Sequence, residues 1–196
     1  MAKNKLTLQL IFGLPLLGLA LTTLFYFFVT NYHIHMGTIN KGILITPPKQ
    51  MSELHIMNKE AKPYVWNDGK GFWTFMVAGT SVCDDACQKI MYFVRQTHTA
   101  LGSGSLRVKM VYLNLGTQLS PETSELFAKE YAHFDVLTVN PEEAKQWFAK
   151  DKPQLDVLHS ANFYVVDPSG WVMMYYTDAQ SYKEVIKDMK FLLKNS

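Results

Sequence analysis

Two cysteines, Cys83 and Cys87, are the residues of this chain whose type and spacing most directly suggest chemistry. A disulfide between residues so close in sequence closes a very short loop and restricts the unfolded chain little. On one face of a helix, residues four apart have Cβ atoms about 5–6 Å apart, and both sulfurs can then bind one metal ion. A disulfide needs a Cβ separation of about 3.8 Å. The spacing therefore favours metal binding, with a structural disulfide, a redox-active pair and two inert thiols as the alternatives.

The segments around the cysteines predict that both lie where a strand is followed by a helix. The aromatic run at 71–79 (GFWTFMVAG), bounded by glycines, is typical of a strand buried on both faces. Both thiols are expected in the first helical turn, where the partial positive charge of the helix N-terminus stabilises a thiolate. The residues that repeat with the period of one helix face are Cys83, Cys87, Ile90, Met91, Val94, His98 and Leu101.

The remainder of the chain alternates between strand and helix patterns and ends with a hairpin and a helix. The expected elements are a strand at 106–115, a helix opened by Ser120 and Pro121, a strand at 134–139, a helix opened by Asn140, two strands around the turn at 167–170, and a helix opened by Ser181. An early β-α-β order followed by a late β-β-α order predicts a thioredoxin-like α/β domain, in which 71–79 and 106–115 are neighbouring parallel strands.

A metal bound by two cysteines needs a third ligand, and His159 is the best candidate. It stands just before the first strand of the expected hairpin, and a thioredoxin-like sheet brings that loop beside the first helix of the domain. Two thiolates and one imidazole form a soft set of three donors that suits Cu(I) and, with a distorted geometry, Cu(II). Zinc accepts the same ligands with water in the fourth position, but the ligand set favours copper.

The N-terminal part of the chain predicts a single transmembrane helix. Residues 6–29 carry no charge and, as a helix, are long enough to cross about 30 Å of hydrocarbon. Lys3 and Lys5 precede this span, which predicts a cytoplasmic N-terminus and an extracytoplasmic domain. A signal peptide cleaved near Ala20 is the alternative, but the apolar stretch continues well beyond that residue.

Three parts are therefore expected: an anchor at 1–30, an extracytoplasmic tether at 31–62 that contains two prolines, and the thioredoxin-like domain at 63–196. His33 and His35, just outside the membrane, are interpreted as part of an interfacial segment rather than as a transient copper site. The net charge of +2 produces no field that would favour nucleic acid as a partner.

These residues resemble the Sco/SenC family of membrane-anchored copper proteins that assist cytochrome c oxidase assembly. The resemblance rests on the anchor, the strand residues 72–77 (FWTFMV), the Cys83-x-x-x-Cys87 motif and the run 159–173 (HSANFYVVDPSGWVM). It implies copper, as Cu(I) or Cu(II), bound by the two cysteines and His159. It also implies a partner, the cytochrome c oxidase subunit that carries a copper centre. The implied location is the inner membrane, with the C-terminal domain in the periplasm or another extracytoplasmic space.

The chain departs from the family pattern beside the site. Asp84 and Gln88 follow the two cysteines where the family usually has proline, and Leu158 stands where an aspartate commonly precedes the histidine. Asp84 is expected either to add an oxygen ligand or to cap the helix.

The first functional hypothesis is a copper-binding assembly factor, that is, a metallochaperone. If the protein is an enzyme, we expect a thiol:disulfide oxidoreductase that acts through Cys83 and Cys87. A membrane-tethered scaffold is the third hypothesis. His159 separates the first two, because chelation needs the imidazole and thiol exchange does not.

Overall fold

A computed structural model of the chain describes residues 2–31, 40–66, 69–149 and 162–196. They belong to two compact units, Met1–Ile39 and Asn40–Ser196. The described residues of the first unit form helix α1 (Ala2–Asn31). Its stretch Ile11–Phe28 has a mean hydropathy of 2.0 and is long and apolar enough to cross a membrane. The N-terminal helix is therefore a candidate transmembrane span, in agreement with the sequence pattern.

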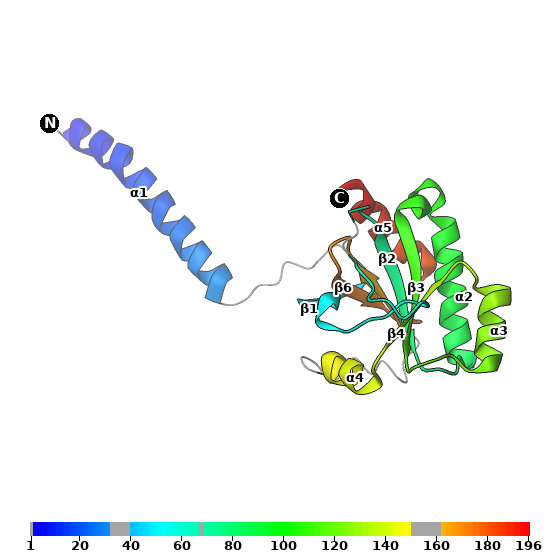
Figure 1. Ribbon diagram of the computed structural model, residues 1–196. Coiled ribbons are helices and arrows are strands. Elements are labelled where there is room, and N and C mark those ends of the chain that lie inside the picture. Colours follow the sequence, from blue (N-terminus) through cyan, green and yellow to red (C-terminus); the bar gives the residue numbers. More distant parts are fainter. Residues whose placement is uncertain (1, 32–39, 67–68, 150–161) are drawn as a thin grey trace. The chain divides into compact units, whose positions relative to one another are not determined.

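The second unit is built around a six-stranded sheet with the strand order β1-β6-β5-β2-β3-β4 (Figure 1). The strands β2, β3 and β4 run parallel to one another, whereas β5, β6 and β1 pair antiparallel with their neighbours. Phe75 lies opposite Met110, which confirms the predicted parallel pairing of 71–79 with 106–115. The strand bounds are β1 Ile43–Gln50, β2 Trp73–Gly79, β3 Val108–Leu115, β4 Asp135–Val139, β5 Phe163–Val166 and β6 Trp171–Tyr176.

Helices cover both faces of the sheet, so the hydrophobic core has two halves (Figure 1). Side chains from α2, α3 and α5 pack on one face, and side chains from α4 and η1 pack on the other. Phe75 and Val77 of β2 point into the first half, and Met76 and Ala78 point into the second, because successive strand residues face opposite sides. The helix bounds are α2 Asp85–Ala100, α3 Pro121–Glu130, α4 Pro141–Ala149 and α5 Tyr182–Lys194, with the 3-10 helices η1 Met51–Glu53 and η2 Gly102–Arg107.

The helix starts expected from capping residues are confirmed. The Ser120 hydroxyl accepts a hydrogen bond from the Thr123 N–H at 3.1 Å, and Ser181 forms the expected capping box with Glu184. Caps of this kind satisfy backbone N–H groups that have no partner inside the helix. The observed element order from β2 onward is that of the predicted thioredoxin-like α/β domain.

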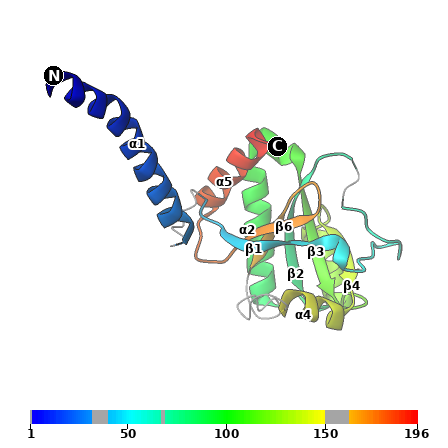
Figure 2. The same cartoon turned by 90° about the vertical axis from the view of Figure 1, so that its left-hand side faces the viewer.

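The expected tether at 31–62 is wrong from Asn40 onward, because the compact unit begins at that residue. Strand β1 lies beside β6 and pairs with it antiparallel (Figure 2), with Ile43 opposite Tyr175. After β1, Met51 is fully buried in the core. This segment is therefore part of the folded domain.

Two prolines explain why β1 was not predicted from the sequence. Pro47 and Pro48 lie in the part of the strand where its register with β6 shifts, between Leu44 and Lys49. Proline is tolerated there because β1 is the edge strand and a bulge leaves backbone groups out of the ladder. The opposite edge, β4, forms an isolated antiparallel bridge in which Met57 and Thr138 exchange two N–H to C=O hydrogen bonds of 2.9 Å.

A buried carboxylate fixes the beginning of the domain. Asp188 of α5 accepts hydrogen bonds from the backbone N–H groups of Lys41 (2.6 Å) and Gly42 (3.0 Å). It also accepts one from the Tyr176 hydroxyl at 2.9 Å. Gly42 has no room for a side chain, since an added Cβ would lie 2.7 Å from the Tyr176 ring. Residues 41 and 42 are thus held against β6 and α5.

Candidate functional site

Cys83 and Cys87 form a disulfide at the end of β2, with their Cα atoms 5.1 Å apart. The prediction that both cysteines lie in the helix is wrong for Cys83. Helix α2 begins at Asp85, and Asp84 has the extended backbone of an N-cap residue. Cys83 therefore precedes the helix, and Cys87 lies in its first turn. Because Cys83 lies outside the helix, the two cysteines are not held at the separation of helical neighbours, and their sulfurs form a bond.

The backbone of Cys83 is fixed from both sides. Its N–H donates to the Thr123 hydroxyl at 3.0 Å, and its C=O accepts from the Gln88 side-chain amide at 3.2 Å. Cys83 is buried, with an exposed fraction of 6%, whereas Cys87 is half-buried at the edge of the core. Cys87 is consequently the more accessible half of the disulfide.

Tyr112 of β3 lies beside the disulfide. Its hydroxyl is 3.8 Å from the Cys87 Sγ and donates a hydrogen bond to the Thr80 C=O at 2.7 Å. Burial, together with the negative charge of Asp84, raises the pKa of Tyr112, so the phenol stays protonated. A Cβ at Gly79 would lie 2.4 Å from this hydroxyl. Glycine at the end of β2 is what allows Tyr112 to reach the loop.

Asp84 caps helix α2. Its carboxylate accepts a hydrogen bond from the Cys87 N–H at 2.9 Å. Of the two roles expected for Asp84, the structure shows the cap. Gln88, the other residue found in place of proline, serves as the donor to the Cys83 C=O.

Replacing Asp84 with alanine should remove this cap and lower the free energy of unfolding by about 1 kcal/mol. Urea unfolding of the full chain in detergent, followed by tryptophan fluorescence, measures the change. Asp85→Ala is the matched control, because Asp85 is exposed and follows the cap in the first turn. Equal losses in the two variants would contradict a capping role for Asp84.

His159 falls in 150–161, and His33 and His35 fall in 32–39. Both ranges lie outside the described residues. Within the part of the chain that the structure describes, no three His, Cys, Asp or Glu side chains are grouped to hold a metal ion. Strand β5 begins at Phe163, which lies opposite Val77 near the end of β2. The start of β5 thus lies at the same end of the sheet as the C-terminal end of β2, which the cysteine loop follows.

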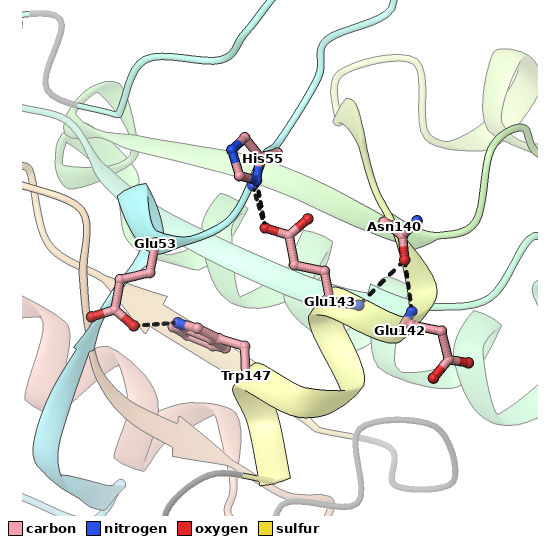
Figure 3. A network of polar contacts seen from close by, with 6 residues as sticks. All are labelled: Glu53, His55, Asn140, Glu142, Glu143 and Trp147. Atoms are coloured by element: carbon pink, nitrogen blue, oxygen red, sulfur yellow. Dashed lines mark hydrogen bonds and ion pairs between the residues drawn. The ribbon is translucent and has the colours of Figure 1, made fainter.

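The other end of 150–161 is attached to α4, and a polar network holds this helix to the segment after β1 (Figure 3). The His55 N–H and ring Nδ1 both contact one oxygen of Glu143, at 2.9 and 2.8 Å. The backbone hydrogen bond from His55 is the main cause that lowers the pKa of Glu143. The Trp147 indole N–H donates to Glu53 at 3.2 Å, and Asn140 caps the helix. These contacts make His55 a surface residue that holds α4.

Sequence reasoning did not identify Tyr112 or Thr123 as neighbours of the cysteines. Tyr112 lies within a strand pattern, and Thr123 lies in the helix for which only Ser120 and Pro121 were singled out. The available signal was the expected pairing of 71–79 with 106–115, which places Tyr112 opposite Val77. That pairing brings a tyrosine to the sheet edge where the cysteine loop begins.

A protein family described as "Transmembrane-like, thioredoxin-like, C-terminal domain" matches residues 73–196. The chain belongs to this family. The thioredoxin-like region that it shares with the family runs from β2 to the C-terminus and contains the disulfide. No curated protein matches the chain.

Solved structures of Sco proteins share the fold of this thioredoxin-like domain. Copper-bound yeast Sco1 is 16% identical with a TM-score of 0.58, over 82% of this chain and 96% of its own. BsSco from Bacillus, described as a member of the Sco family of cytochrome c oxidase assembly proteins with a disulfide switch, is 20% identical with a TM-score of 0.56, over 81% and 99%. A SCO1/SenC family lipoprotein from Bacillus anthracis is 22% identical with a TM-score of 0.54, over 77% and 95%. The expected resemblance to Sco/SenC proteins is confirmed in fold.

Proposed function

We propose that this protein is a membrane-anchored copper-binding assembly factor that carries copper to a copper centre of cytochrome c oxidase. The observation that carries the proposal is that the cysteine loop and the start of β5 lie at the same end of the sheet. The cysteine loop follows the end of β2, and β5, which His159 precedes by four residues in the sequence, starts opposite Val77 at that end. The fold shared with copper-bound Sco1 supports the same assignment.

The donor set suits copper as cargo. Two sulfurs and one imidazole form a soft set of ligands, which favours Cu(I) and accepts Cu(II) in a distorted geometry. A disulfide has no thiolate to offer, so Cys83 and Cys87 must be reduced before they bind copper. Copper loading therefore depends on the redox state of the pair.

The proposed location is the inner membrane, with the domain on the extracytoplasmic side. Helix α1 is the anchor, and the lysines at positions 3 and 5 favour a cytoplasmic N-terminus. The disulfide agrees with this location, because disulfides persist mainly in oxidising compartments.

A second candidate function is thiol:disulfide exchange with partner cysteines before they receive metal. The disulfide favours it, since the pair is already positioned to pass between oxidised and reduced forms. Exchange requires Cys83 and Cys87 but not His159, so one substitution distinguishes the two functions.

The His159→Ala variant should lose copper affinity by more than about tenfold while its cysteines still reduce a model disulfide. The expected loss follows from removing one of three donors, because even groups that only orient ligands change metal affinity by about 10–100-fold. The measurement is copper retained by the reduced full chain, in detergent, against a competing Cu(I) chelator.

His133→Ala is the control for this experiment. His133 is exposed and lies beside Phe134 just before β4, at the end of the sheet opposite the cysteine loop, so its loss should leave copper retention unchanged. If His159→Ala retains copper as well as the unmodified chain does, copper binding by the proposed trio is wrong. If oxidase assembly in cells fails only in cysteine variants, thiol exchange becomes the function.

A further inference from the structure

The feature that carries the inference is the position of one hydroxyl between two acceptors. The Tyr112 hydroxyl lies 2.7 Å from the Thr80 C=O and 3.8 Å from the Cys87 Sγ. A phenol has one proton to donate. In the disulfide form this proton is directed to the Thr80 carbonyl.

The relative strength of these two acceptors changes when the disulfide is reduced. A disulfide sulfur is neutral and accepts hydrogen bonds weakly, so the carbonyl competes successfully for the proton. A cysteine thiolate is negatively charged, and hydrogen bonds to charged groups are about twice as strong as those between neutral groups. Thr80 is exposed, so its carbonyl can accept from solvent when the phenol turns away.

We propose that Tyr112 is a positioning residue that transfers its hydrogen bond from the Thr80 carbonyl to the Cys87 sulfur on reduction and thereby favours the reduced pair. This inference rests on the proposed function, because both copper binding and thiol exchange need the reduced cysteines. The tyrosine keeps its proton throughout and exchanges only its hydrogen-bond acceptor.

An external dithiol supplies the two electrons that reduce the disulfide. A thiolate of the dithiol attacks Cys87, the more accessible sulfur, which breaks the Cys83–Cys87 bond and forms a mixed disulfide. The second thiol of the reductant then displaces Cys87. Two electrons pass to the cysteines: Cys83 takes one proton and becomes a thiol, Cys87 leaves as a thiolate, and the reductant leaves as a disulfide with its other proton released to solvent.

The surroundings of the two cysteines differ in a way that directs the effect to Cys87. The backbone of Cys83 is held by Thr123 and Gln88, and that cysteine is buried. The Cys87 N–H is taken by Asp84, whose negative charge opposes a thiolate beside it. A donor at the Cys87 sulfur offsets this repulsion, and Tyr112 is placed to supply it.

The test is the equilibrium of the full chain, in detergent and without copper, with buffers of oxidised and reduced dithiothreitol. Tyr112→Phe should shift the equilibrium constant about tenfold toward the disulfide, which corresponds to a potential lower by about 30 mV. The fraction reduced is measured by thiol alkylation and mass spectrometry, and thermal unfolding verifies that the variant is folded.

Tyr131→Phe is the matched control. Tyr131 packs on the same ring, Phe127, and its hydroxyl donates to the Gln88 C=O at 3.4 Å rather than to a sulfur. Its loss should leave the equilibrium constant within about twofold of the unmodified value. A Tyr112→Phe constant equal to that of Tyr131→Phe, or shifted toward the reduced pair, would overturn the inference.

A second measurement does not depend on the stability of the variant. Fluorine NMR of the unmodified chain labelled with 3-fluorotyrosine should show the Tyr112 resonance shifting on reduction more than that of Tyr131. Equal or absent shifts would also overturn the inference. Because copper is excluded from both experiments, their outcome is independent of whether the copper-carrier proposal holds.

Discussion

Replacing either cysteine with serine should lower copper affinity by more than about 100-fold and abolish reduction of a model disulfide. A serine hydroxyl is a poor ligand for soft copper, and losing a direct ligand exceeds the roughly 10–100-fold effect of losing a group that only orients one. Cys83→Ser and Cys87→Ser should therefore behave alike in both assays, unlike His159→Ala. Copper per protein after chelator challenge and the rate of disulfide reduction are the two measurements.

Val82→Ala is the control for the cysteine variants. Val82 lies in the same loop and its side chain is exposed, so its truncation should change neither assay. The serine variants should also remain folded, because a disulfide that closes so short a loop contributes about 2 kcal/mol at most by chain entropy. Copper retention at the unmodified level in either serine variant would contradict the proposed site.

Asp188→Ala should lower the free energy of unfolding by about 2–4 kcal/mol. The substitution leaves the N–H groups of Lys41 and Gly42 and the hydroxyl of Tyr176 without their buried acceptor. Each buried donor without a partner carries a desolvation cost of about 1–3 kcal/mol, and water entering the space left by the carboxylate offsets part of it. Denaturant unfolding of the full chain measures the loss.

Two further variants test the cause of this loss. Asp188→Asn keeps one side-chain oxygen as an acceptor, so its stability should lie between that of Asp188→Ala and the unmodified chain. Asp178→Ala should cost less than about 0.5 kcal/mol, because Asp178 is exposed and its ion pair with Lys89, at 3.8 Å, lies on the surface. If Asp188→Ala costs no more than Asp178→Ala, the anchoring role of Asp188 is wrong.

The strands and helices from residue 71 onward could be predicted because local patterns and tertiary structure agree there. The run at 71–79 is apolar on both faces, and β2 is indeed buried on both sides. Ser120 and Ser181 cap the helices that they were expected to open. In each case the residue that signals the element also makes the contact that stabilises it.

Strand β1 could not be recognised from its own residues. Proline normally argues against a strand, and Pro47 and Pro48 are accepted only because β1 is an edge strand with a register shift. The start of α2 was also predicted too early, because local periodicity does not show where the helical backbone begins. The apolar period includes Cys83, but the extended backbone of Asp84 ends that period before the helix begins.

The candidate site was predicted in part. The pair Cys83 and Cys87 was identified from residue type and spacing, which favoured metal binding, whereas the structure joins the two residues in a disulfide, one of the alternatives. The position of Tyr112 beside the disulfide depends on the pairing of β2 with β3 and on the absence of a side chain at Gly79. These are properties of the fold and not of any short motif. Copper binding through His159 stays a prediction, which the chelator experiment tests.

The two edge strands of the sheet limit how copies of this protein can join. Open strand edges allow sheets of neighbouring molecules to join, and this hazard grows with local concentration. In the β1 edge, Pro47 and Pro48 have no N–H to offer a neighbour. In the β4 edge, the backbone of Met57 already occupies both groups of Thr138. If helix α1 anchors the protein as proposed, copies at high density in one bilayer should therefore remain separate molecules rather than polymerise edge to edge.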